Sequence, residues 1–174
     1  MNPSDLTRRK AIFALSATAL SATALSATAL SAALCPLALP ARAAQTEGAI
    51  HILKDPGCGC CTAWATILDR AGFQVTTEPV AGTALMRMKA DHGIPAALAS
   101  CHTALIDGYA IEGHVPVADI RRLLAARPDA VGLAVPGMPY GSPGMGPEED
   151  REAFDVHLIR RDGSTEIFAS YPAA

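Results

Sequence analysis

Residues 51–73 read HILKDPGCGCCTAWATILDRAGF, and the hydrophobic pattern changes partway along this stretch. The first residues are rich in β-branched and apolar side chains and predict a strand, which Pro56 and Gly57 end with a turn. From Cys61 onward apolar side chains recur at helical spacing as far as Gly72, a residue suited to a helix C-cap. The stretch therefore predicts a strand, a turn that carries three cysteines, and a helix.

The chain after this stretch continues to alternate between strand and helix patterns. We expect a strand, a helix, a hairpin, a helix, a loop with a strand-like start, and a second hairpin. These elements cover residues 73–80, 82–94, 101–116, 117–128, 130–150 and 155–171. Asp-Gly dipeptides mark the turns of both hairpins. The order predicts an α/β fold, a thioredoxin-like sandwich in which helices pack on a mixed sheet.

Residues 1–43 have the pattern of a secretory signal peptide. Three basic residues at 8–10 precede an apolar stretch over 11–39, and a small-x-small cleavage pattern ends at Ala43. We therefore predict a signal peptide over 1–43 and a metal-binding domain of thioredoxin-like type over 44–174. An uncleaved membrane anchor and export by the twin-arginine route stay open as alternatives to a cleaved Sec signal.

The predicted mature chain is acidic and long enough for one domain with its own core. Residues 44–174 carry ten Lys and Arg against sixteen Asp and Glu, so their formal net charge is −6. An acidic surface argues against binding to nucleic acid or to anionic membranes. A metal cation is compatible with it.

Cys58, Cys60 and Cys61 place three thiols within four positions at the predicted helix N-terminus, where thiolates are stabilised. A disulfide between Cys58 and Cys61 is feasible, but it would leave Cys60 beside it as a thiol that invites disulfide exchange. Cu(I) prefers thiolates and would use all three, and thiolates can bridge several such ions. Zinc would accept the same donors, but the usual two separated C-x-x-C pairs are missing. A metal site, a dithiol redox site and structural disulfides all stay open, with Cu(I) favoured.

Further soft ligands occur in two later segments. Cys101 and His102 stand at the start of the first predicted hairpin, and Met138 and Met145 lie in a loop rich in Gly and Pro. Methionine usually fills cores, but such a loop offers little core to fill. The remaining histidines are interpreted as ordinary surface or strand residues: His51, His92, His114 and His157.

Several motifs in one order resemble the CopG-like family of exported metal-binding proteins, which is associated with copper resistance and was long a domain of unknown function. The motifs are KDPGCGCCTAW at 54–64, GFQV at 72–75, SCHTA at 100–104, IEGHVP at 111–116 and GMPYGSPGM at 137–145. The resemblance covers roughly residues 50–171. It implies a thioredoxin-like fold, a periplasmic location and copper bound through thiolates. The metal ligands that it implies are Cys58, Cys60, Cys61, Cys101, His102, Met138 and Met145.

We therefore predict a periplasmic copper-binding protein for copper resistance or homeostasis, which binds more than one Cu(I) ion through a cysteine cluster. It would store copper, pass it to other periplasmic copper-handling proteins, or interconvert Cu(I) and Cu(II), which would make it an oxidoreductase. Zinc is the less favoured metal, and neither nucleic acid nor, after signal cleavage, a membrane is expected as a partner. The alternatives are a thiol–disulfide oxidoreductase that uses Cys58 and Cys61, and a disulfide-stabilised binding module without chemistry.

Overall fold

The computed structural model describes residues 47–174, so the predicted signal peptide over 1–43 lies outside the described residues. The strands are β1 (Ala49–Lys54), β2 (Gln74–Pro79), β3 (His102–Ile106), β4 (Tyr109–Glu112), β5 (Ala130–Ala134), β6 (Phe154–Arg160) and β7 (Thr165–Tyr171). The helices are α1 (Gly59–Arg70), α2 (Gly82–Asp91) and α3 (Val117–Ala126), with short 3₁₀ helices η1 (Ala96–Leu98) and η2 (Glu148–Asp150). None of the helices in this part of the chain has the length and apolar character that a membrane crossing requires.

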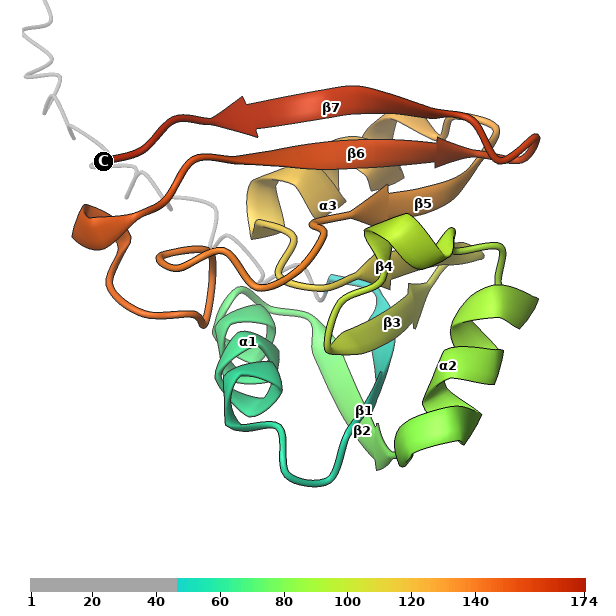
Figure 1. Ribbon diagram of the computed structural model, residues 1–174, viewed down its shortest axis with the longest axis horizontal. Helices are drawn as coiled ribbons and strands as arrows, with labels where there is room; N and C mark the ends of the chain where they lie inside the picture. Colours follow the sequence, from blue (N-terminus) through green and yellow to red (C-terminus); the bar gives the residue numbers. More distant parts are fainter. Residues whose placement is uncertain (1–46) are drawn as a thin grey trace, which may run out of the picture. The chain divides into compact units, whose positions relative to one another are not determined.

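The seven strands form one mixed sheet in the order β2-β1-β3-β4-β5-β6-β7 (Figure 1). The pairs β1–β2 and β4–β5 are parallel, and the other four neighbouring pairs are antiparallel. The predicted α/β class with a mixed sheet is confirmed. The predicted order of strands and helices is also observed, while the two 3₁₀ helices had no signal in the sequence.

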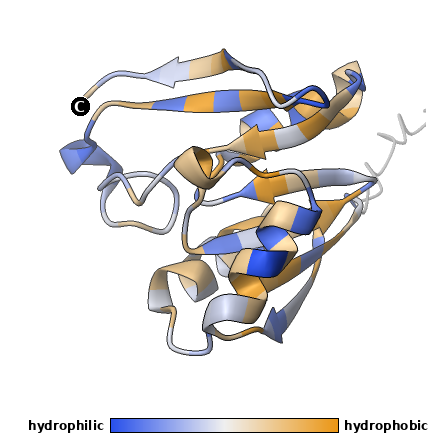
Figure 2. Cartoon of the chain, turned by 45° about the vertical axis from the view of Figure 1, so that its right-hand side comes forward, coloured by the Kyte–Doolittle hydropathy of each residue, from blue (hydrophilic) through white to orange (hydrophobic). Residues whose placement is uncertain are grey.

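Apolar side chains cover both faces of the sheet. On one face, Trp64 and Leu68 of α1 and Ile120 and Leu123 of α3 are fully buried in the main core cluster. A smaller cluster on the other face gathers around Ile94 and η1. In Figure 2, β6 alternates between hydrophobic and hydrophilic residues, as expected for a strand with one buried face.

The turn between β1 and α1 is built by its own side chains. Cys58 has an extended backbone and caps α1, because its sulfur accepts a hydrogen bond from the Cys61 N–H at 3.3 Å. The helix therefore begins at Gly59, earlier than its apolar spacing indicates, and includes Cys60 and Cys61 in its first turn.

The β3–β4 hairpin is closed by Asp107 and Gly108, whose φ angles of 49° and 84° are those of a tight turn with two left-handed residues. Lys54 at the end of β1 pairs with His102 at the start of β3. Because these two strands are antiparallel, the cysteine turn after β1 comes to lie beside the residue that precedes His102, which is Cys101.

Candidate metal centre

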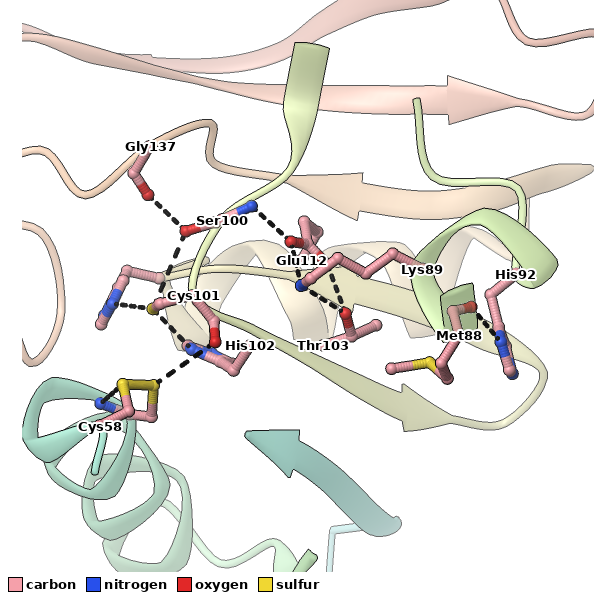
Figure 3. A network of polar contacts seen from close by, with 12 residues as sticks. Cys58, Met88, Lys89, His92, Ser100, Cys101, His102, Thr103, Glu112 and Gly137 are labelled. Atoms are coloured by element: carbon pink, nitrogen blue, oxygen red, sulfur yellow. Dashed lines mark hydrogen bonds and ion pairs between the residues drawn. A yellow bond between two sulfur atoms is a disulfide. The ribbon is translucent and has the colours of Figure 1, made fainter. Parts of the chain in front are cut away.

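The cysteine turn contains one disulfide and one free thiol. Cys58 and Cys61 are bonded to each other, and Cys60 is free (Figure 3 shows the disulfide). The sulfur of Cys60 lies 3.5 Å from that of Cys58. The structure thus records an oxidised form, in which two of the four predicted cysteine ligands are bonded to one another.

Cys101 lies where the cysteine turn meets the open end of the β3–β4 hairpin. Its Sγ is 3.2 Å from His102 Nδ1 and 3.1 Å from His114 Nε2, and its carbonyl oxygen is 3.9 Å from the Cys61 sulfur. Two groups of candidate donor atoms share this sulfur, and within each group all atoms lie within 4.8 Å of one another. The groups are Cys58, Cys60, Cys61 and Cys101, and Cys101, His102 and His114.

The interpretation of His114 as an ordinary surface or strand residue is wrong. Its side chain is fully buried, and its ring nitrogen contacts Cys101. The cause is the register of the hairpin: Thr103 pairs with Glu112, so the next positions outward place His114 opposite Cys101. The Asp-Gly turn already determines this register, so counting outward from it would have identified His114 from the sequence.

His102 is held in the core with one ring nitrogen unpaired. Its imidazole is fully buried and lies against Trp64 with ring centroids 4.4 Å apart. Among the residues that the structure describes, Nε2 finds no hydrogen-bond partner. A buried polar atom without a partner is costly, and the ring nitrogen that faces the Cys101 sulfur is the other one, Nδ1.

Burial determines the protonation of these groups. It is the main cause that raises the pKa of Cys101 to about 11, and the neighbouring Cys60 raises it further. Burial lowers the pKa of His102 to about 3, and the charges of His114 and Lys89 add to this effect. Burial also lowers the pKa of His114. Both imidazoles are thus neutral at pH 7 and keep a lone pair for a metal, whereas Cys101 holds a proton that a metal must displace.

The predicted methionine loop between β5 and β6 is fastened to the site through its backbone. The Gly137 carbonyl accepts a hydrogen bond from the Ser100 hydroxyl. The Pro143 carbonyl oxygen lies 2.8 Å from His114 Nδ1, which leaves Nε2 facing Cys101. Such a bond on the far nitrogen orients an imidazole toward a metal.

The same loop packs against the start of α1. A Cβ atom at Gly144 would come within 2.8 Å of the Trp64 backbone nitrogen and 3.1 Å of the Cys60 carbonyl oxygen, so only glycine permits this approach. Next to it, Met145 is half-buried, whereas Met138 is 54% exposed. The loop reaches the site through backbone groups, and both methionines stay predicted ligands.

These donors fit a soft metal. Thiolates and neutral imidazoles are the ligands that Cu(I) and zinc accept, and the set contains no carboxylate. In the oxidised form, Cys60 and Cys101 keep free sulfurs, and the Cys101 sulfur lies beside the two imidazoles. Reducing the disulfide by two electrons adds two more thiols. The arrangement is therefore able to bind a soft metal and to exchange electrons at the same place.

Fold and site together define the class as a small mixed α/β protein with a buried centre of thiols and imidazoles. Two solved structures of copper resistance protein CopG, form 1 and form 2, are each 44% identical to this chain, with TM-scores of 0.68 and 0.66. The first aligns with 73% of this chain and 100% of its own, and the second with 72% and 98%. The chain belongs to the CopG-like copper-resistance family.

Residues 98–145 also match the model of a protein family of unknown function, DUF411. That segment includes Cys101, His102, His114 and the predicted methionine loop. No curated protein matches the chain.

Proposed function

We propose that this protein acts in the periplasm in copper resistance and binds more than one Cu(I) ion at the cysteine turn and hairpin end. The observation that carries the proposal is the position of the Cys101 sulfur, which belongs to both donor groups. A thiolate shared in this way is suited to bridge soft ions. The proposed ligands are Cys58, Cys60, Cys61, Cys101, His102 and His114, with Met138 and Met145 as auxiliary ligands.

Copper is the substrate of the proposed activity, which interconverts Cu(I) and Cu(II). Formation of the disulfide from the Cys58 and Cys61 thiolates releases two electrons, and two Cu(II) ions accept them to become two Cu(I) ions. The reverse reaction takes two electrons from two Cu(I) ions and reopens the disulfide. The close approach of Cys60 and Cys101 to this pair supports the proposal, because they hold the ions beside the sulfurs that change oxidation state.

The test compares Cu(I) binding by reduced wild type, Cys101→Ser and Cys60→Ser in competition with a chelator under anaerobic conditions. Loss of a residue that only orients a ligand costs about 10–100-fold in metal affinity, so loss of the shared thiolate should cost more than about 100-fold. Ser164→Ala, in the exposed turn between β6 and β7, is the matched control and should bind as wild type does. Wild-type affinity in both cysteine variants would contradict the proposal.

A second candidate is a thiol–disulfide oxidoreductase acting on proteins, and the Cys58–Cys61 disulfide at a helix N-terminus favours it. This function needs only the bonded pair. Insulin reduction by wild type and by Cys60→Ser distinguishes the two candidates. Equal and robust activity would favour protein disulfide exchange, while little activity in either protein would favour copper as the substrate.

The proposed location has its own test, since it depends on residues 1–43. Protein recovered from the periplasmic fraction should begin at Ala44 when its N-terminus is sequenced. Recovery of the full-length chain from membranes would contradict a cleaved signal peptide and favour the anchor.

A further inference from the structure

A buried ion pair lies directly beside Cys101 and His102. Lys89 of α2 is 2% exposed and Glu112 at the end of β4 is fully buried, with Lys89 Nζ 2.6 Å from Glu112 Oε1. Burying two charges carries a large desolvation cost, and well-packed apolar residues in place of such a pair often give equal or higher stability. A gain in stability therefore does not explain why this buried ion pair is present.

The Glu112 carboxylate holds the chain on both sides of Cys101 and His102 (Figure 3). Its Oε1 accepts a hydrogen bond from the Ser100 N–H at 2.5 Å. Its Oε2 accepts one from the Thr103 hydroxyl at 2.5 Å. Ser100 precedes the two candidate ligands and Thr103 follows them, so one side chain anchors both ends of the segment that carries them.

Lys89 connects this anchor to α2. Its ammonium donates to Glu112 and, at 2.9 Å, to the hydroxyl of Thr103. The anchor also extends toward the methionine loop, because the Ser100 hydroxyl donates to the Gly137 carbonyl. A rotation of Glu112 would therefore release the backbone of Ser100, the residue that precedes Cys101 and also holds the start of that loop.

We propose that Lys89 and Glu112 are positioning residues, which hold the backbone around Cys101 so that its sulfur faces His114 and the cysteine turn. The inference rests on the proposed Cu(I) site and adds to it the residues that orient its shared thiolate. The ion pair touches no candidate donor atom, so it acts through the backbone of Ser100 and the side chain of Thr103.

The test uses two double variants, K89M/E112L and K89M/E112Q, which both remove the two charges and leave none unpaired in the core. Leucine cannot accept the Ser100 N–H, whereas the glutamine oxygen can. We expect K89M/E112L to bind Cu(I) about 10–100-fold more weakly than wild type in chelator competition, and K89M/E112Q to recover most of that loss. Urea unfolding measures the stability of each protein alongside.

The matched control is Tyr171→Phe, which removes a 2.7 Å hydrogen bond to the buried carboxylate of Asp119. It should lower stability and leave Cu(I) binding unchanged. If K89M/E112L does not fold, Thr103→Val takes its place, since it removes one of the two anchors and keeps the ion pair. Wild-type affinity in the folded variant that lacks an anchor overturns the proposal.

A measurement without metal separates this inference from the proposed function. In a Cys60→Ser background, the alkylation rate at Cys101 is followed in its peptide by mass spectrometry. If wild type binds no Cu(I), the proposed function fails and these rates decide the inference. If K89M/E112L changes the alkylation rate at Cys101 and K89M/E112Q restores it, the positioning role is supported. Equal rates in the Cys60→Ser protein and in both of its double variants overturn the proposal.

Discussion

Two hairpins in this molecule both turn at an Asp-Gly dipeptide, but one buries its polar side chains and the other leaves them exposed. In the β3–β4 hairpin, His102, Thr103 and Glu112 are all fully buried. In the β6–β7 hairpin, β7 is largely exposed, and the ion pair of Arg160 with Glu166 lies on the surface. The turn dipeptide is the same, so the turn does not set the difference.

The place of each hairpin in the sheet explains the contrast. β3 and β4 lie between β1 and β5 in the strand order and are covered by helices, whereas β7 is an edge strand. Polar groups buried in the sheet's interior must be paired, and charges there interact strongly. Exposed pairs are screened by water and contribute little. The same residue types are therefore expected to matter in one hairpin and to be replaceable in the other.

The largest difference between the two hairpins should appear in how much the loss of an ion pair lowers the free energy of unfolding. Lys89→Met leaves the Glu112 carboxylate buried without its cation, so we expect the free energy of unfolding to fall by about 3–5 kcal/mol. Arg160→Ala removes the exposed pair and should change it little. Urea unfolding of the two variants measures both effects. A small loss in Lys89→Met would mean that water or a proton relieves the unpaired carboxylate, and the two hairpins would then differ less than their burial indicates.

The next contrast concerns two histidines, one in each hairpin region. His114→Ala removes a neutral imidazole that contacts Cys101, and we expect Cu(I) affinity to fall about 10–100-fold. His157→Ala, in β6, should leave the affinity unchanged. Chelator competition on the reduced proteins is the measurement. Equal affinities in the two variants would remove His114 from the site and leave the thiolates and His102 as its proposed donors.

The sequence predicted the elements well because each is marked by local signals. The strand, cysteine turn and helix within residues 51–73 follow from a change of hydrophobic period, and both hairpins follow from their turns. The thioredoxin-like type stays a prediction. The two short 3₁₀ helices were missed, since three residues are too few to show a period.

The candidate site residues that the sequence indicated include the cysteines of the turn and the distant Cys101 and His102, whereas His114 was missed. The three cysteines of the turn are neighbours in sequence, whereas His114 reaches Cys101 only through the hairpin register. Lys89 had no signal at all, because a lysine in a polar helix is ordinarily solvated and its partner is 23 positions away. Whether Cys58 and Cys61 are bonded depends on the redox conditions, so the sequence could only leave that alternative open.

The smallest expected effect is the release of one proton from Cys101 when copper binds. The direction of its pH dependence follows from the burial of that thiol. The thiol of Cys101 has a pKa of about 11, so below that pH its proton must leave when copper binds. The copper-free protein then holds one more proton than the complex, and raising the pH favours binding. This group alone should raise the Cu(I) affinity tenfold for each pH unit, which corresponds to about 1.4 kcal/mol.

His102 should add no slope above pH 5, because its pKa of about 3 leaves it neutral there. The number of protons released per protein molecule as copper binds, measured in weakly buffered titrations between pH 6 and 8, should fall by one in Cys101→Ser. Asp162→Asn, in the exposed β6–β7 turn, is the matched control. Hydrogen bonds from Ser164 lower the pKa of Asp162, so it stays ionised throughout and its replacement should leave proton release unchanged. Equal proton release in wild type and Cys101→Ser would mean that copper does not bind this buried thiol as a thiolate, and that only the cysteines of the turn supply thiolates.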